Sequence, residues 1–527
     1  RKGVPLGYTR IVSFMEDDND HVLILKNSDD GVKVHKMNVN NLKTNYLSNE
    51  PKAVGGMHAR ISSIVVDNND EPRFAVEYDP VNQKNYDDDV VYMHARNADS
   101  DWKHIPFENK RVKDLPDVSP LGFNDTNTVY YFTSNHDISG MGGTGLFSYD
   151  FTTAKMELLF RKPDVDLLGG VYDHDENLIA VRFEAGYTDY YYLENGNKEA
   201  IQLHKSLRAS FPNSDISITS YTKDKSIATL FVSSDKNPGD FYLYNTKKKS
   251  LSYLSSTKPQ IDPKLMAAVE PFNLKARDGL KMYGQLTLPP NKELKNLPMV
   301  VYPHGGPYGP RDYWGWDARA QMLANNGYLV LQLNFRGSGG YGAGFQEAGY
   351  GEWGAKMQDD ITDATKWAIA QGYAAKDRIC IHGVSYGGYA AMQAVVKEPD
   401  LYKCSIPDAG PYDLDFQLRK ADSFKGQPKR RKWYFDRMLG KNFEALNKER
   451  SPAYNLDKLK APLLIVHGKE DKRVPIGNAY LLEDKLKEKG IKYQTLYKKD
   501  GHGFQKVPHR IELYKTMLKF LKKHIGE

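Results

Sequence analysis

The sequence contains only two cysteines, Cys380 and Cys404, among 527 residues. So few cysteines exclude a disulfide scaffold and any cysteine-rich zinc or iron–sulfur site. One disulfide between the two remains open, but we expect buried free thiols, because cysteine is among the residue types most often buried. Cysteine usage therefore does not fix the redox compartment.

Long apolar runs are also missing, since no stretch approaches the roughly 18–20 residues of a membrane helix. We expect no membrane partner. With 40% hydrophobic and 27% charged residues, the composition excludes global disorder. The chain starts at Arg1, and its first ten residues do not resemble a secretion signal. The compartment stays open between the cytoplasm and, after removal of a signal, the periplasm or the exterior.

Charge is divided unevenly along the chain. Residues 1–260 carry 30 basic and 37 acidic side chains, a balance of −7, whereas residues 261–527 carry 43 and 30, a balance of +13. Two oppositely charged domains that attract each other explain this division better than nucleic-acid binding does. We therefore predict two domains and no nucleic-acid partner.

Residues 1–260 are predicted to form a β-propeller. A short apolar strand, a polar turn and a second short strand recur at intervals of about 44–57 residues, a spacing typical of propeller blades. We interpret each repeat as the outer hairpin of one blade. A propeller must close to hide its edges, so we expect further blades before Arg1; an irregular β-sandwich is the alternative. The five hairpins are Val34–Leu47, Val91–Ile105, Leu146–Leu159, Tyr190–Leu203 and Phe241–Leu254.

Residues 261–527 follow a different pattern, in which buried strands alternate with helices. This alternation predicts a mostly parallel, doubly wound sheet of the α/β-hydrolase type. The predicted strands are Met299–Tyr302, Tyr328–Asn334, Arg378–His382, Lys403–Ile406, Pro462–His467 and Lys492–Tyr497. The predicted helices are Asp360–Gln371, Tyr389–Lys397, Asn478–Lys489 and Arg510–Lys523.

The segment Gly383–Gly388 (GVSYGG) fits the G-x-S-x-G nucleophile elbow. The bare pattern is weak, but here an apolar strand precedes it and a helix of small residues follows, as the motif requires. Glycines flank Ser385 because a Cβ at those positions would clash in so sharp a turn. We predict that Ser385 is a nucleophile.

A serine hydroxyl needs a base, and in this fold the order along the chain is Ser, then Asp or Glu, then His. Asp471 follows one predicted strand and His502 follows the next. Loops at the carboxyl ends of parallel strands open on one sheet edge, so the three side chains can converge. We predict that His502 takes the proton of Ser385 and that Asp471 orients His502. Asp500 and Glu470 are rival acids, but Asp500 lies too close to His502 in sequence for that role.

The negative charge that develops on the substrate oxygen needs N–H donors. We predict the backbone N–H of Tyr386, next to the nucleophile, and that of Gly306 in the loop His304–Pro307 (HGGP). A structural glycine turn is the alternative for this loop.

The segment Gly337–Gly342 matches G-x-G-x-x-G but is rejected as a dinucleotide site. That site needs a helix at once, whereas residues 343–354 are glycine-rich and aperiodic. The sequence holds no H-E-x-x-H, P-loop or calcium-loop pattern either, so we expect no cofactor and no metal.

Together these motifs resemble the prolyl oligopeptidase family of serine peptidases, in its acylaminoacyl-peptidase and dipeptidyl-peptidase-like branch. The resemblance covers residues 266–527 in the family's order, and residues 1–260 match in architecture only. It rests on His304–Pro307, Asn334–Ser338, Gly340–Gly342, Gly383–Tyr389, Ser451-Pro452, His467–Asp471, Val474-Pro475 and Gly501–Phe504.

The resemblance implies hydrolysis of short peptides through an acyl-enzyme on Ser385, with a propeller that limits substrate size. By analogy, Tyr412 and Phe416 would line the pocket for the substrate residue before the scissile bond, with core packing as an equal alternative. His304 and Arg336 are further candidates for substrate binding. In one branch a Glu-Glu pair holds the substrate amine, and this sequence has no such pair. The sequence does not fix the oligomeric state, so a homo-oligomer stays open.

Two other functions are weighed against a peptidase. A carboxylesterase acting on small acyl esters would use the same triad, so the triad does not separate the two, although a propeller favours peptides. A propeller binding module with a vestigial hydrolase is the second rival, and a complete triad argues against it.

Overall fold

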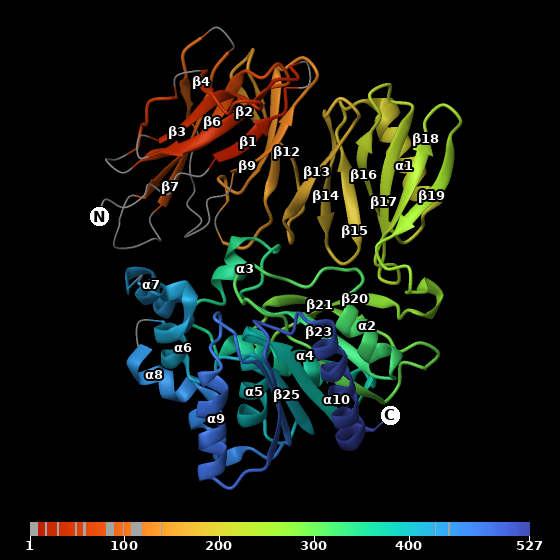
Figure 1. Cartoon of the computed structure of the whole chain (residues 1–527), viewed down its shortest axis with the longest axis vertical. Helices are drawn as coiled ribbons and strands as arrows, with labels where there is room; N and C mark the ends of the chain where they lie inside the picture. The colour runs from red at the N-terminus through yellow and green to blue at the C-terminus, as the bar shows by residue number, and fades with distance from the viewer. Residues whose placement is uncertain are drawn as a thin grey trace. The chain divides into compact units, whose positions relative to one another are not determined.

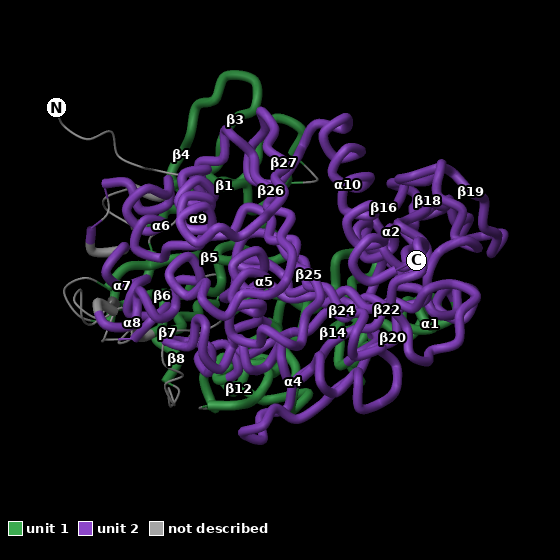
Figure 2. Tube along the Cα trace, turned by 90° about the horizontal axis from the view of Figure 1, so that it is seen from below, with its two compact units in different colours: residues 1–185, 189–206, 340–344 green, residues 186–188, 207–339, 345–527 purple. Residues whose placement is uncertain are grey.

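The computed structural model describes residues 9–15, 18–28, 31–47, 50–55, 59–80, 89–97, 100–106, 118–138, 140–426, 428–440 and 443–526. Figure 1 shows the elements along the chain, and Figure 2 colours the two compact units into which the chain divides. Unit 1 comprises residues 1–185, 189–206 and 340–344, and unit 2 comprises residues 186–188, 207–339 and 345–527. None of the described helices is both long enough and apolar enough to cross a membrane.

The N-terminal half is built from antiparallel sheets whose strands follow one another in chain order, as in propeller blades. Among the described residues there are five. The first two are β1–β4 (Thr9–Ser13, His21–Ser28, Gly31–Asn38, Thr44–Tyr46) and β5–β8 (Arg60–Val66, Pro72–Pro80, Asp89–Ala95, Lys103–Ile105). The others are β9–β12 (Val118–Phe123, Val129–Ser134, Gly145–Asp150, Lys155–Arg161), β13–β15 (Leu167–Tyr172, Leu178–Glu184, Thr188–Tyr192) and β16–β19 (Asp215–Tyr221, Ile227–Ser233, Asp240–Asn245, Ser250–Ser256).

Apolar side chains from neighbouring sheets pack together in unit 1. Phe74 and Met93 from the second sheet share a core cluster with Phe123, Tyr130 and Phe132 from the third. The rings of Phe74 and Tyr130 lie 4.3 Å apart between centroids. Alternation along each strand places these residues on one face, so each sheet buries that face against the next.

One of the five predicted hairpins is wrong. At Tyr190–Leu203 the expected second strand is replaced by helix α1 (Lys198–Ser210). Asn197 caps this helix, because its side-chain oxygen accepts hydrogen bonds from the N–H groups of Glu199 and Ala200. His204 and Leu207 are both buried and lie three residues apart, a spacing typical of a helix and not of a strand. The sheet β13–β15 consequently has three strands.

The C-terminal half contains one eight-stranded sheet of order β20-β21-β23-β22-β24-β25-β26-β27. β21 pairs antiparallel with both neighbours, and the strands from β23 onward pair in parallel. The sequence prediction located the six parallel strands and missed the two antiparallel ones at the edge. The bounds are β20 Val269–Lys275, β21 Lys281–Thr287, β22 Leu297–Val301, β23 Leu329–Asn334, β24 Ala374–Val384, β25 Cys404–Asp408, β26 Leu463–Gly468 and β27 Tyr493–Lys498.

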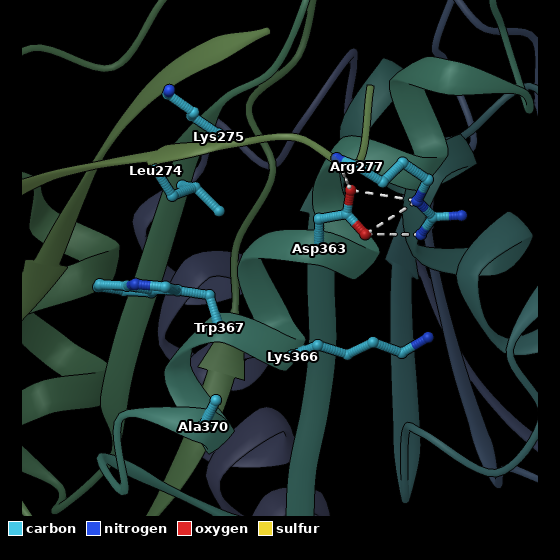
Figure 3. A pocket seen from close by; sticks show the side chains of 7 residues that line it. All are labelled: Leu274, Lys275, Arg277, Asp363, Lys366, Trp367 and Ala370. Carbon is cyan, nitrogen blue, oxygen red and sulfur yellow. Dashed lines mark hydrogen bonds and ion pairs between the residues drawn. The ribbon is translucent and has the colours of Figure 1, made fainter. Parts of the chain in front are cut away.

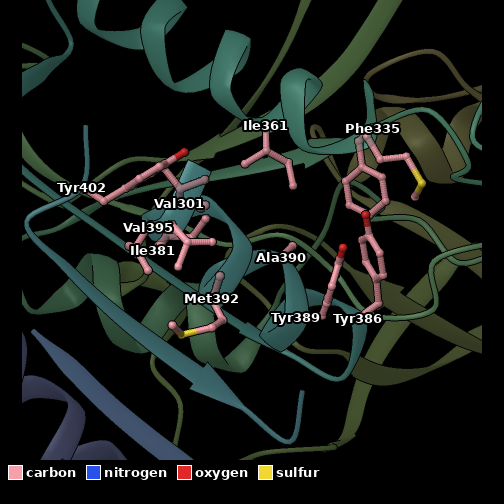
Figure 4. Close-up of a cluster of buried hydrophobic side chains, with 14 of the residues drawn as sticks. Val301, Phe335, Ile361, Ile381, Tyr386, Tyr389, Ala390, Met392, Val395 and Tyr402 are labelled. Atoms are coloured by element: carbon pink, nitrogen blue, oxygen red, sulfur yellow. The ribbon is translucent and has the colours of Figure 1, made fainter. Parts of the chain in front are cut away.

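Helices cover both faces of this sheet, and alternate strand residues divide between two core clusters. Met299 and Val301 join a cluster with α4 (Lys356–Ala370), α5 (Tyr386–Lys397) and α9 (Gly477–Glu488), part of which Figure 4 shows. Val300 joins a second cluster with α2 (Ala318–Asn325) and α10 (Val507–Ile525). This is the doubly wound arrangement that the strand–helix alternation predicts. The helices are α2 Ala318–Asn325, α3 Ala343–Glu347, α4 Lys356–Ala370, α5 Tyr386–Lys397, α6 Leu414–Lys420, α7 Pro428–Leu439, α8 Phe443–Arg450, α9 Gly477–Glu488 and α10 Val507–Ile525.

The state of the two cysteines differs from the expectation. The expectation of free thiols is wrong, because Cys380 on β24 and Cys404 on β25 form a disulfide. The two positions are direct partners in the parallel pairing of these strands, with Cα atoms 4.7 Å apart. The sheet β16–β19 belongs to compact unit 2, together with the strands of the C-terminal sheet.

Candidate active site

Ser385 lies between the end of β24 and the start of α5, in a backbone conformation that side chains rarely adopt. Its φ is 62° and its ψ is −121°. The turn is tight: a Cβ on Gly383 would overlap the backbone of Gly387, and one on Gly387 would overlap the carbonyl of Pro303. The strand–turn–helix geometry of a nucleophile elbow is therefore present at Ser385.

His502 and Asp471 lie in the loops that follow β27 and β26, and they contact each other. The Nδ1 atom of His502 lies 2.7 Å from Oδ2 of Asp471. The Asp471 side chain has no exposed surface, whereas that of His502 is 31% exposed. With Nδ1–H donating to the carboxylate, Nε2 is the ring nitrogen left to accept a proton.

The carboxylate of Asp471 is fixed by its own turn. Its Oδ1 accepts hydrogen bonds from the backbone N–H groups of Arg473 and Val474, both at 2.9 Å. The sequence analysis did not identify these donors. The sequence signal for these donors was the position of Asp471, two residues before Arg473 and three before Val474. At this spacing an aspartate accepts hydrogen bonds from backbone N–H groups of its own turn.

The structure brings the predicted triad to one sheet edge through β24, β26 and β27. Ser385 and His502 both belong to the described part of the chain, and there is no hydrogen bond between their side chains. Hydrogen bonds of this kind are often long in enzymes without substrate. The rival acid Asp500 is engaged elsewhere, since its Oδ2 accepts from Nδ1 of His509 at 2.9 Å and from the backbone N–H of Lys506.

The loop predicted to supply an oxyanion donor packs against the elbow. A Cβ on Gly305 would lie 3.4 Å from the Cβ of Ser385, and Gly306 adopts a φ of 122°. Tyr386 is the first residue of α5, where backbone N–H groups have no partner within the helix. The roles of the Tyr386 and Gly306 N–H groups as oxyanion donors stay predictions.

His304 is held by its own loop and by the segment that follows β23. Its Nε2 lies 2.8 Å from Oγ of Ser338, its Nδ1 lies 2.7 Å from the carbonyl oxygen of Gly305, and its ring stacks on Phe335. Burial lowers the pKa of His304 to about 4. The imidazole is therefore neutral at physiological pH, with both nitrogens bonded inside the protein.

Arg336 is committed to two carboxylates. The residue is 4% exposed, and its guanidinium donates to Asp360 and to Asp278 at distances of 2.8–2.9 Å. These ion pairs give Arg336 a structural role, which is to hold the loop after β23 in place. A contact with substrate would require these ion pairs to break.

Tyr412 and Phe416, the candidate pocket residues, lie near the end of β25 and on α6. Tyr412 is fully buried, and its hydroxyl accepts a long hydrogen bond, 3.4 Å, from the N–H of Gly410. Phe416 is half-buried, with its ring beside Gly477 at the start of α9. Both positions fit core packing as well as a pocket wall.

A surface hollow has none of these residues in its lining (Figure 3). The guanidinium of Arg277 and the carboxylate of Asp363 bond to each other there. Within the described part of the chain, no group of three or more His, Cys, Asp or Glu is placed to hold a metal ion. The hollow is lined by Leu274, Lys275, Arg277, Asp363, Lys366, Trp367 and Ala370.

The fold and the elbow define the C-terminal half as an α/β hydrolase. Residues 314–527 match the family described as prolyl oligopeptidase family. Over these residues the chain carries a domain of that family, which agrees with the resemblance seen in the motifs.

Curated relatives extend the similarity into the N-terminal half. Dipeptidyl aminopeptidase BIII of Pseudoxanthomonas mexicana is 31% identical over 429 residues, which cover 79% of this chain and 60% of that protein. Dipeptidyl peptidase family member 6 of Caenorhabditis elegans is 27% identical over 511 residues, which cover 89% of this chain and 66% of that protein. The chain thus spans about two thirds or less of the length of these relatives.

Solved structures share the fold. The acylaminoacyl peptidase of Pyrococcus horikoshii aligns with a TM-score of 0.60 at 18% identity, covering 99% of this chain and 71% of that one. A puromycin-hydrolysing peptidase of Mycobacterium tuberculosis aligns with a TM-score of 0.53 at 16% identity, covering 98% and 86%. The propeller-type sheets followed by an α/β hydrolase are therefore a known architecture.

Proposed function

We propose that this protein is a serine peptidase that hydrolyses short peptides through Ser385, His502 and Asp471. The observation that carries the proposal is the combination of a strained serine on an elbow with a buried Asp471 bonded to His502 at the same sheet edge. The family of residues 314–527 and the peptidase relatives support it.

In the proposed first step, Oγ of Ser385 attacks the peptide carbonyl carbon while Nε2 of His502 takes the hydroxyl proton. The bond to Asp471 holds His502 in the required tautomer and stabilises its cation. The N–H groups of Tyr386 and Gly306 are proposed to receive the negative charge on the carbonyl oxygen. His502 then gives its proton to the leaving amine, and the peptide C–N bond breaks to leave an acyl-enzyme.

In the proposed second step, water replaces the amine. His502 accepts a proton from water while the water oxygen attacks the acyl carbon. His502 then returns the proton to Oγ of Ser385 as the ester bond breaks. The peptide's acyl part leaves as a carboxylic acid, and the enzyme is restored.

The proposed substrates are oligopeptides, with the propeller-type sheets limiting substrate size. Support comes from relatives named as dipeptidyl aminopeptidase and acylamino-acid-releasing enzyme. The sequence has no Glu-Glu pair to hold a substrate amine. Experiment therefore decides whether the substrate N-terminus is free or acylated.

The test compares the wild type with Ser385→Ala and with Ser220→Ala, an exposed serine on β16. A fluorophosphonate probe should label the wild type and Ser220→Ala but not Ser385→Ala. Mass spectrometry of a peptide library with free and acetylated N-termini should show cleavage by the first two proteins only. Turnover of short esters with no cleaved peptide would replace the peptidase with an esterase. Labelling of Ser385→Ala equal to that of the wild type would contradict the assignment of the nucleophile.

A further inference from the structure

Asp408, the last residue of β25, carries a buried carboxyl group that the proposed mechanism does not use. The residue is 1% exposed, and neither carboxyl oxygen has a hydrogen-bond partner. An ion-pair partner is Arg319, whose Nη1 lies 3.8 Å from Oδ2. Leaving a carboxyl group without hydrogen bonds in the interior is costly, so this one requires an explanation.

The backbone places Asp408 between the elbow and β26, the strand that precedes Asp471. The carbonyl oxygen of Asp408 accepts the N–H of Ser385 at 2.9 Å, and Asp408 pairs in register with Val466 of β26. The next residue, Ala409, is buried and has a φ of 49°. A left-handed alanine is strained, so the fold holds this position in a costly conformation.

The groups that act electrostatically on Asp408 include the predicted base and acid. Burial raises the pKa of Asp408 to about 6. The charges of Arg319 and His502 act to lower this pKa, whereas the charge of Asp471 acts to raise it. Arg319 also donates a hydrogen bond to Nε2 of His382, whose pKa burial lowers to about 3, so this histidine stays neutral. The titratable and charged groups that interact with Asp408 or Arg319 are His382 on β24, Tyr302 after β22, Asp317 before α2, Tyr412 after β25, Asp471 after β26, His502 after β27 and Tyr514 on α10.

We infer that Asp408 is a positioning residue for the proposed reaction: its carboxylate, held beside Arg319, supplies negative charge that stabilises the imidazolium formed when His502 accepts the Ser385 proton. The inference rests on the proposed function of the triad. Charges in a buried site act strongly because little solvent screens them. The negative charge of Asp408 is lost as the pH falls through its pKa of about 6, so the support should be lost over the same range.

The test follows the rate of fluorophosphonate labelling of Ser385 from pH 4 to pH 9. This reaction reports proton transfer from Ser385 whatever the natural substrate. In the wild type the acid limb of the rate profile should be broader than that of a single ionisation. In Asp408→Asn it should narrow to a single ionisation and move to lower pH by about 0.5–1 unit. The rate on the alkaline plateau should fall about 3–10-fold, since one unit corresponds to a factor of ten.

Asp312→Asn is the matched control, because Asp312 also has a buried carboxyl oxygen without a hydrogen-bond partner. Burial raises the pKa of Asp312 to about 8, and the charges that act on it are those of Asp317 and Arg311. This variant should keep the wild-type profile. A folded Asp408→Asn that labels more slowly with an unmoved acid limb has lost structural support only, and would overturn the inference.

The wild-type profile tests the inference even if Asp408→Asn does not fold. An acid limb with the width of one ionisation would overturn it without any variant. If the wild type is not labelled at any pH, the proposed function fails and the inference fails with it. If labelling occurs but no peptide is cleaved, the peptidase proposal fails while the profile still decides the role of Asp408.

Discussion

The Nδ1 atom of His502 lies 2.7 Å from Oδ2 of Asp471, although 31 residues separate them in sequence. The acid is fully buried and fixed by two backbone N–H groups, whereas the histidine keeps an exposed side. A buried acid and a reachable base are what proton transfer from Ser385 requires.

Asp471→Asn should reduce kcat/KM by about 10³–10⁴-fold, because an amide can donate to Nδ1 and so favour the wrong tautomer of His502. Glu470→Gln is the control, since this neighbouring side chain is 54% exposed and should leave kcat/KM within about twofold. The measurement is the rate of peptide hydrolysis, or of fluorophosphonate labelling. Equal effects of the two substitutions would remove Asp471 from the triad.

Gly387→Ala should lower the free energy of unfolding by about 1–3 kcal/mol, because the new Cβ would overlap the carbonyl of Pro303. At Gly501 a Cβ would meet nothing within 4 Å, so Gly501→Ala should change the unfolding free energy by less than about 0.5 kcal/mol. Urea unfolding measures both. Full stability of Gly387→Ala would mean that the elbow is looser than the structure shows.

Arg336→Met should destabilise the protein by about 3–5 kcal/mol, because it leaves Asp360 buried without its charge partner. Asp278→Asn is the milder comparison. Asp278 is 37% exposed, and loss of an ion pair so open to solvent costs about 1 kcal/mol or less. Thermal unfolding and KM are measured together. A stable Arg336→Met with a raised KM would instead support the substrate-binding role.

Asp500 should make the protein's stability depend on pH below about 4. Burial alone raises the pKa of Asp500, but hydrogen bonds from His509 and the backbone outweigh it and hold the pKa at about 2, below its usual 3.8. The folded state therefore gains from the ionised form above pH 4 and loses that gain as the pH falls toward 2. Asp500→Asn should lose less stability than the wild type between pH 7 and pH 3, as read from urea midpoints. Equal losses would contradict this.

Local patterns predicted much of the fold and the candidate site. The parallel strands end close to their predicted bounds because continuous apolar runs and glycine breaks mark them directly. The elbow was readable because few residue types tolerate its geometry. Asp471 and His502 were readable because both follow strands, and the ends of parallel strands meet at one edge.

Other features depend on partners distant in sequence. Helix α1 is an exception, because the helical spacing of its buried residues is a local signal. The disulfide depends on the register between β24 and β25, which pairs Cys380 with Cys404. The antiparallel strands β20 and β21 were missed because their assignment depends on pairing at the sheet edge.

By itself, the sequence determined which residues carry reactive groups and in what order the strands present them, because turn chemistry and hydrophobic patterning are local. Only the tertiary structure decided which of those groups are free to act. It bonded Arg336 to two aspartates, it bonded both nitrogens of His304 to residues of two neighbouring loops, and it left the carboxyl of Asp408 without hydrogen bonds. The physical reason is that burial and charge pairing are set by neighbours that the chain brings together only when it folds.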